Sequence, residues 1–238
     1  MQTTETTSDK KSSQRPVVHD GPLSLANAEA TASVSDSYAG KLREAATRRT
    51  NPLNCRVQRH LPPHMRGIAA FAFVTGWRTP SEILPLEWRQ VDLKTGEVRL
   101  DVGATKNGEG RVFPITIELR RILDAQQEIA KTLKREHGTI PRHVFCYTKG
   151  VKAGQGITEG GYNKAWRKAR LAAGCPGRIP HDFRRTAVRN LVRAGVPERV
   201  AMQMTGHKTR AVFERDNIVS EGDLRDAARR LNTYTAAG

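Results

Sequence analysis

Apolar side chains recur every three or four residues along much of the chain after residue 60, which is the period of an amphipathic helix. The main predicted helices cover residues 64–75, 116–136, 160–173 and 181–194. Of these, 181–194 has a strong apolar stripe. The pattern also predicts a short helix over 81–88, which Pro85 perturbs.

Residues with strong capping preferences mark where several of these helices begin and end. Gly76 stops the first helix, and Thr116 is placed to cap the helix that follows it. Pro197 opens a further helix that Gly206 ends. A Ser-x-x-Asp box from Ser220 to Asp223 predicts a last helix. Its apolar stripe consists of Leu224, Ala227, Ala228 and Leu231.

A different period appears between residues 97 and 115. Apolar residues alternate with polar ones over 97–102, which suits a half-buried strand, and 111–115 is the expected partner strand. Asn107, Gly108, Glu109 and Gly110 supply a flexible turn between them. The predicted fold class is therefore mainly α with a small antiparallel β-sheet (α+β).

The first 60 residues lack such periodicity. Residues 1–40 are rich in Ser and Thr and poor in large apolar side chains, so we expect a mostly disordered tail. Residues 41–60 carry six Lys or Arg against one Glu, which fits either a DNA-contacting arm or a solvated linker. The predicted division is a tail and basic linker over 1–60 and one folded domain over 61–238.

Charge narrows the class of partner. The 238 residues hold 40 Lys and Arg against 24 Asp and Glu, a net charge of +16. Residues 161–216 alone hold thirteen basic and four acidic residues, a net +9, whereas residues 1–40 are net −2 (three basic, five acidic). A dense positive excess favours a polyanion such as nucleic acid. The plain alternative is a basic protein without such a partner.

Cysteine usage and hydropathy exclude other classes. Cys55, Cys146 and Cys175 are isolated and odd in number, so neither a disulfide framework nor a zinc spacing is present, which favours a reducing cytosol. The longest apolar run, 68–74, is far too short to span a bilayer. We expect a soluble, cytoplasmic protein with no metal and no cofactor.

The most specific local signal is His181 with Arg184. Three residues apart on a helix, they lie near one another, to one side of the apolar stripe, where they can face a ligand. Taken alone, such a pair is often only a surface histidine and arginine, so its meaning depends on what accompanies it.

That pair belongs to one of five segments in a fixed order, which together closely resemble the tyrosine recombinase (phage integrase) family over roughly residues 61–232. The first two contain Arg78 and Glu82, and the third contains Lys106. The segments are Thr75-Gly76-Trp77-Arg78, residues 81–88, Thr105-Lys106-Asn107, residues 181–186 and Thr205-Gly206-His207-Lys208-Thr209.

The resemblance implies a catalytic domain that breaks and rejoins DNA without a metal. Arg78 and Arg184 would clamp the scissile phosphate, since guanidinium is permanently charged and bidentate. Lys106 would protonate the leaving 5′ oxygen. His181 would assist proton movement at the nucleophile, and His207 would hydrogen-bond the phosphate. Site-specific recombination or integration is the implied activity.

The implied partner is double-stranded DNA, with a homo-oligomer or a recombinase partner on the DNA. Besides the site residues, the basic side chains around them are candidates for contacts to the DNA backbone. The expected DNA-binding residues are Arg78, Lys106, Lys164, Arg167, Lys168, Arg184, Arg185, Lys208 and Arg210.

The chain departs from the family at the nucleophile. The tyrosine position, nine residues after His207, falls on Asp216. A tyrosine phenoxide forms a phosphodiester of similar energy to the one it breaks, whereas a carboxylate would form a high-energy mixed anhydride. We therefore expect impaired cleavage. The alternatives are another tyrosine, either Tyr234 or one from a partner subunit, and a water activated by Asp216.

Two further departures concern Arg78 and the start of the chain. Glu82 follows Arg78 by four residues, where family members often show three, and the stretch before residue 61 is too short and polar for the family's core-binding domain. A reading from another class also stays open, in which 197–205, a turn at 206–207 and 209–215 form a helix-turn-helix DNA-binding regulator. It leaves Arg78 and Lys106 unexplained.

Overall fold

The computed structural model describes residues 52–103, 108–138, 140–219 and 221–236. By internal contacts the chain divides into Met1–Ser37 and Tyr38–Gly238, and every described residue belongs to the second unit. The expected tail over 1–40 and most of the expected basic linker, up to residue 51, lie outside the described residues.

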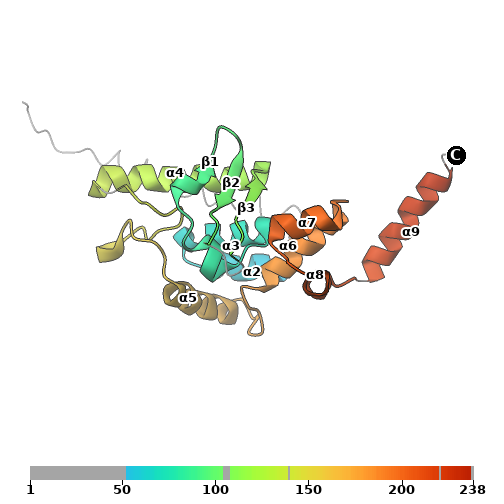
Figure 1. Ribbon diagram of the computed structural model, residues 1–238. Coiled ribbons are helices and arrows are strands. Elements are labelled where there is room, and N and C mark those ends of the chain that lie inside the picture. The colour runs from blue at the N-terminus through green and yellow to red at the C-terminus, as the bar shows by residue number, and fades with distance from the viewer. Residues whose placement is uncertain (1–51, 104–107, 139, 220, 237–238) are drawn as a thin grey trace, which may run out of the picture. The chain divides into compact units, whose positions relative to one another are not determined.

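Helices dominate the described part, as the fold class predicted (Figure 1). The helices are α2 (Pro52–His60), α3 (Pro63–Thr75), α4 (Ile117–His137), α5 (Glu159–Ala172), α6 (Asp182–Arg193), α7 (Glu198–Thr205), α8 (Arg210–Asp216) and α9 (Glu221–Ala236). The short helical turns are η1 (Thr79–Ile83), η2 (Trp88–Gln90) and η3 (Gly150–Lys152). The strands are β1 (Val91–Asp92), β2 (Glu97–Leu100) and β3 (Arg111–Pro114).

Helix α3 lies at the centre because its apolar face is buried along its whole length. Ile68, Phe71 and Ala72 are almost fully inaccessible, as the period of the sequence predicted. The helix packs against α6 and α4, while α2 packs against α5 (Figure 1). Gly76 ends α3 in the left-handed conformation, with φ of 67°, and its N–H donates to the Ala72 carbonyl.

The small sheet covers one side of this core. Its strand order is β1-β2-β3, antiparallel throughout. Val98 pairs with Phe113, and both are buried, so the alternation seen in the sequence places one face of the hairpin on the core. The Thr116 hydroxyl accepts from the Leu119 N–H at 3.2 Å and caps α4, as predicted.

The structure corrects the expected helix over 81–88. In its place a π-helical turn, η1, winds around Arg78, whose carbonyl accepts from the N–H groups of both Glu82 and Ile83. Pro85, which has no N–H to donate, lies two residues after the end of this turn. Strand β1 was not predicted, because two residues are too short to show an alternating pattern.

The boundary expected at residue 61 also differs from the structure. Helix α2 precedes it, and Val57 on that helix is fully buried in the core, so part of the expected basic linker belongs to the folded domain. The basic composition hid a helix whose single large apolar anchor is too little for a periodic signal.

The C-terminal helices form a smaller cluster beside this core. Val188 of α6, Ala201 of α7 and Phe213 of α8 bury one another and fix these three helices together. Helix α9 contains the predicted apolar stripe, but none of its described side chains is buried, and Leu224 and Leu231 are exposed. Residue 220, the expected cap, lies outside the described residues.

Candidate functional site

Arg184 of α6 is the centre of the site. Its side chain was expected to face a ligand from the helix surface, whereas the structure buries it to 2% exposure. Nη1 donates to the carbonyls of Gly76 and Thr205 at 2.8 and 2.6 Å, across 108 and 21 positions of sequence. Nη2 is buried and has no hydrogen-bond partner among the described residues. One edge of the guanidinium is therefore anchored and another is unsatisfied.

Arg78 lies beside Arg184 and is held by Glu82. The fully buried Glu82 carboxylate accepts from the Arg78 N–H at 2.7 Å and from its Nη1 at 3.0 Å. The π-helical turn creates this contact, because it brings the side chain of Glu82, four residues after Arg78, back to the Arg78 backbone N–H. The four-residue spacing that departs from the family pattern thus keeps Glu82 on Arg78.

His207 follows the end of α7. Gly206 ends that helix with φ of 71°, and this left-handed turn directs the imidazole inward. Nδ1 lies 2.7 Å from the Thr205 hydroxyl, and Nε2–H donates to the Asp216 carboxylate at 2.9 Å. The ring stands edge-to-face on Phe213 at 5.3 Å, so packing also fixes its plane.

Asp216, the last residue of α8, lies where these groups converge. Besides the bond from His207, its carboxylate is 3.5 Å from Arg184 Nε, 3.7 Å from Arg185 Nε and 4.0 Å from His181 Nε2. The structure thus brings together the sequence-predicted residues Arg184, His181, His207 and Asp216, with Arg78 next to them. His181 immediately precedes α6 as its N-terminal cap residue.

The electrostatics of the site are dominated by burial among like charges. Burial, reinforced by the Arg78 charge, lowers the pKa of Arg184 to about 10. Burial also lowers the pKa of His181 and of His207 despite the nearby Asp216. For Asp216, burial opposes ionisation, but the His207 bond and the charges of His181, His207 and Arg184 outweigh it and lower its pKa. The site favours an anion.

Lys106 lies outside the described residues, so its predicted position stays untested. The flanking hairpin does reach the site: Glu109, just after the gap, pairs with Lys208 at 3.4 Å. That pair places Glu109 beside the turn that carries His207. Lys208, expected to contact DNA, is therefore engaged with the hairpin in this state.

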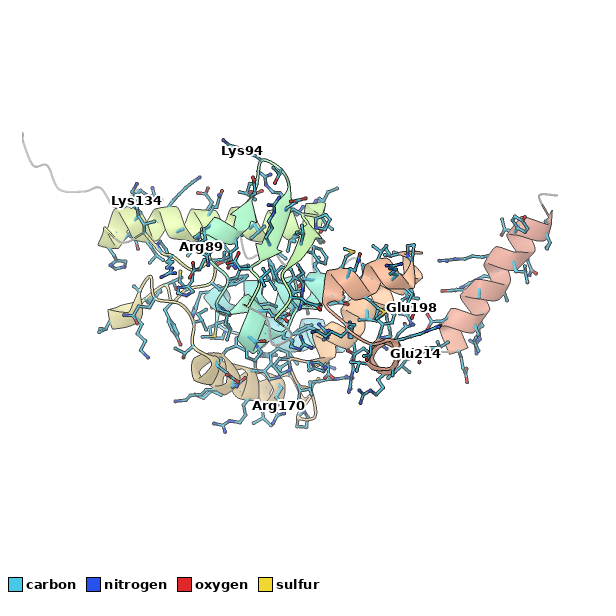
Figure 2. All side chains as sticks on the ribbon, viewed as in Figure 1. Arg89, Lys94, Lys134, Arg170, Glu198 and Glu214 are labelled. Carbon is cyan, nitrogen blue, oxygen red and sulfur yellow. The ribbon has the colours of Figure 1, made fainter. Side chains whose placement is uncertain are left out.

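The other expected DNA-binding residues divide into two groups. Lys164, Arg167 and Lys168 are exposed on α5, and none of them has an ion pair among the described residues; Tyr162 and Trp166 are buried on the same helix. By contrast, Arg210 pairs with Glu198 at 3.1 Å and Glu214 at 3.0 Å, both labelled in Figure 2. Arg185 faces Asp182 and Asp216 at 3.8 and 3.7 Å.

The sequence did not reveal the structural roles of two residues of the site, Arg111 and Thr205. Arg111 of β3 shares Glu82 with Arg78, and the Thr205 carbonyl accepts from both Arg111 and Arg184. A single arginine at the start of a strand gives no sequence signal for such a role.

Metal-binding and membrane-spanning features were searched for over the same residues. Within the described ranges, no three His, Cys, Asp or Glu side chains are placed to hold a metal ion. None of the helices described is both long enough and apolar enough to cross a membrane.

Known proteins with similar sequence or fold place this site in context. A sequence model described as the phage integrase family matches residues 50–215. The integrase of Salmonella phage P22 is 27% identical over 201 residues, which cover 76% of this chain and 49% of that protein. The chain thus spans about half the length of this relative.

Among solved structures, a XerA recombinase superposes with a TM-score of 0.57 at 19% identity, covering 82% of this chain and 63% of that one. A lambda integrase tetramer bound to a Holliday junction gives 0.56 at 17% identity, covering 79% and 57%. At these identities the likeness shows a shared fold, which is the mainly helical fold with a small antiparallel sheet that the sequence predicted.

Proposed function

Because this chain belongs to the phage integrase family, we propose that it binds double-stranded DNA through a phosphate clamp of Arg78, Arg184, His181 and His207, in site-specific recombination or integration. We further propose that Asp216 occupies the position of the nucleophile and that strand cleavage is therefore impaired. The observation that carries the proposal is the buried Arg184 guanidinium, anchored on one edge and facing an anion on the other.

The geometry around Arg184 supports an anion site. Burying a guanidinium is costly unless it is paired, and two backbone carbonyls supply only partial charges. Nε faces Asp216 at 3.5 Å, and Nη2 is unpartnered among the described residues. A phosphodiester offers two non-bridging oxygens at the spacing of a guanidinium edge, so it would satisfy both donors.

Asp216 supports the second part of the proposal in two ways. Its carboxylate already lies among the cations that a phosphate would need, so it competes for them and repels the phosphate at close range. Attack by a carboxylate would also create a mixed anhydride, whose high energy favours immediate hydrolysis over rejoining. Both effects act against ordinary strand exchange.

The exposed cations of α5 support the choice of DNA as partner. Lys164, Arg167 and Lys168 are exposed and lack ion pairs among the described residues, so they are available for phosphates. Lambda integrase has been solved as a dimer bound to a core site and as a tetramer bound to a Holliday junction. We propose a similar oligomeric assembly on DNA for this chain, with Lys106 as proton donor and a catalytic domain that includes α2.

Covalent trapping on nicked duplex DNA tests this function. Wild type, Asp216→Tyr and Asp216→Phe are compared for a protein–DNA adduct that survives denaturation, with Arg184→Met added to the Asp216→Tyr chain as a control. We expect an adduct only from Asp216→Tyr with Arg184 intact, because tyrosine restores the nucleophile in an unchanged clamp.

Other outcomes separate the alternatives. An adduct from wild type that Tyr234→Phe abolishes would make Tyr234 the nucleophile; this side chain is 79% exposed on α9. An adduct formed only when wild type is mixed with a tyrosine-bearing partner indicates donation between subunits. Tight duplex binding that survives Arg78→Met and Arg184→Met would favour a helix-turn-helix regulator built on α7 and α8.

A further inference from the structure

Arg111, at the start of β3, contacts three separate parts of the site with a side chain that is almost inaccessible to solvent. Its side chain is 6% exposed. Nη2 donates to Glu82 Oε1 at 3.0 Å, and Nη1 donates to Glu82 Oε2 at 3.3 Å and to the Thr205 carbonyl at 2.9 Å. The guanidinium also stands over the Trp77 ring at 5.9 Å.

These contacts link the two ends of the clamp. Glu82 is the residue that holds the backbone and side chain of Arg78. The Thr205 carbonyl also accepts from Arg184, and it lies at the end of α7, two residues before His207. The single planar guanidinium of Arg111 therefore joins Glu82, which holds Arg78, to the end of α7, which precedes His207. Its fixed fork of donors suits this role.

The lack of space for a side chain at Gly206 shows how closely Arg111 approaches that turn. A Cβ at position 206 would lie 2.0 Å from Arg111 Cζ and 2.2 Å from both Nη atoms. Any larger residue there must displace the guanidinium from Glu82 and Thr205. Glycine before His207 is thus required by the space that Arg111 occupies as well as by the left-handed φ of 71°.

We infer that Arg111 is a positioning residue, which sets the distance between Arg78 and the Gly206–His207 turn through Glu82 and the Thr205 carbonyl. The inference rests on the proposed function, because it assigns to Arg111 the geometry of the DNA-phosphate clamp. Arg111 is too buried to touch DNA itself, so its effect on DNA binding must pass through Arg78 and His207.

Duplex binding by Arg111→Met, Arg111→Lys and Arg99→Met tests the positioning role. Methionine keeps the stem over Trp77 and removes the guanidinium, while lysine keeps the charge but not the fork. Arg99, exposed on the neighbouring strand and paired with Glu97, is the matched control for the loss of one positive charge. Affinities for a labelled random-sequence duplex are measured at a temperature where circular dichroism shows every variant folded.

We expect Arg111→Met to bind about tenfold more weakly, a coupling within the range seen for residues in one network. Arg99→Met should lose about twofold or less, and Arg111→Lys should recover little. In an Arg78→Met background, Arg111→Met should cost clearly less than in wild type, because only its effect through His207 is left. Equal losses in both backgrounds, full rescue by lysine, or a loss no greater than that of Arg99→Met overturns the inference.

A second measurement is independent of DNA. Gly195 follows α6 with φ of 79°, and a Cβ there would meet nothing within 4 Å, so Gly195→Ala measures the conformational cost alone. In thermal unfolding, Gly206→Ala should lower Tm by about 5 °C more than Gly195→Ala, at the few degrees per kcal/mol expected for this size. That excess should disappear in the Arg111→Met chain.

The two measurements fail separately. If no variant binds duplex DNA, the proposed function is overturned, and with it positioning for DNA. If DNA binding is intact but the excess cost of Gly206→Ala persists without the Arg111 guanidinium, the link between Arg111 and the turn is overturned while the proposed function stands.

Discussion

Two buried arginines meet at the Thr205 carbonyl and have opposite surroundings. Arg111 donates to it at 2.9 Å and Arg184 at 2.6 Å, and both side chains are almost inaccessible. Arg111 has both Glu82 oxygens within hydrogen-bonding distance. The carboxylate that faces Arg184 is that of Asp216, at 3.5 Å from Nε, and Nη2 is unpartnered among the described residues.

The difference distinguishes an arginine that holds the fold together from one that can bind an anion. A buried cation with a bidentate carboxylate partner is internally compensated, so it holds elements together and needs no ligand. A buried cation with an incomplete partner gains free energy from any anion that fits beside it. Burial lowers the pKa of both arginines, and it lowers the pKa of Arg184 to about 10.

Of the changes proposed, removing Arg184 should have the largest effect on DNA binding and on stability. Arg184→Met removes the side-chain donor to the Gly76 carbonyl, leaves the Thr205 carbonyl with Arg111 alone, and removes the proposed clamp, so duplex affinity should fall about 100-fold, or ~3 kcal/mol. Tm should also fall by about 10 °C, because these buried acceptors lose a donor. Fluorescence anisotropy and calorimetry measure both. Arg120→Met, an exposed arginine on α4, is the control and should change neither by much.

Replacing the cations of α5 should have the next largest effect. The triple change of Lys164, Arg167 and Lys168 to alanine should reduce the slope of log affinity against log salt by about 3, roughly one unit for each phosphate contact. Tm should stay constant, because these side chains are exposed.

The α4 cations provide the matched control for this triple. Arg120, Arg121 and Lys131 are also exposed, but each pairs with an acidic residue three or four positions away. Their replacement should reduce the salt slope by much less. An equal reduction from both triples would show that net charge, not an unpaired face, controls binding.

Acidification should have the smallest effect, and it should act at His64, outside the site, as well as at His181 and His207. Burial lowers the pKa of His64, His181 and His207, so the unfolded chain binds more protons than the folded one once the pH falls below 6.5. The free energy of unfolding should therefore decrease from pH 6.5 downward, through the lowered values. Asp216 has a lowered pKa, so its contribution persists in this window and is lost only at more acid pH.

Urea denaturation across this range measures the decrease, and His207→Asn should remove its share. A stability that rises on acidification would contradict the direction of these shifts.

The sequence predicted the helices that bury a regular stripe and missed the elements that depend on distant contacts. Helices α3, α4, α5 and α6 match their predicted ranges because each repeats apolar residues at the helical period. The π-helical turn at Thr79–Ile83 was missed because Glu82, its structural anchor, is bound by Arg111 29 positions later. Local pattern contains no information on such a partner.

The sequence named residues that the structure brings together, but it did not predict their arrangement. Motif order pointed to Arg78, His181, Arg184 and His207 as site candidates, because the resemblance depends on residue type and spacing. The burial of Arg184 was not foreseen, since the carbonyls that anchor it lie 108 positions before it and 21 after it. The role of Arg111 depends in the same way on Thr205, 94 positions away.

The most direct test of the account is whether Asp216 occupies the place of a DNA phosphate. The duplex affinity of Asp216→Asn is compared with that of wild type and of Asp124→Asn, which removes the same charge from an exposed ion pair on α4. Opposite or like charges about 4 Å apart interact by ~4 kcal/mol at an effective dielectric of about 20, so even partial relief of competition should be measurable.

We predict that Asp216→Asn binds about tenfold more tightly than wild type, whereas Asp124→Asn gains about twofold or less. Equal gains from both substitutions, or weaker binding by Asp216→Asn, would contradict the claim that the carboxylate fills the clamp.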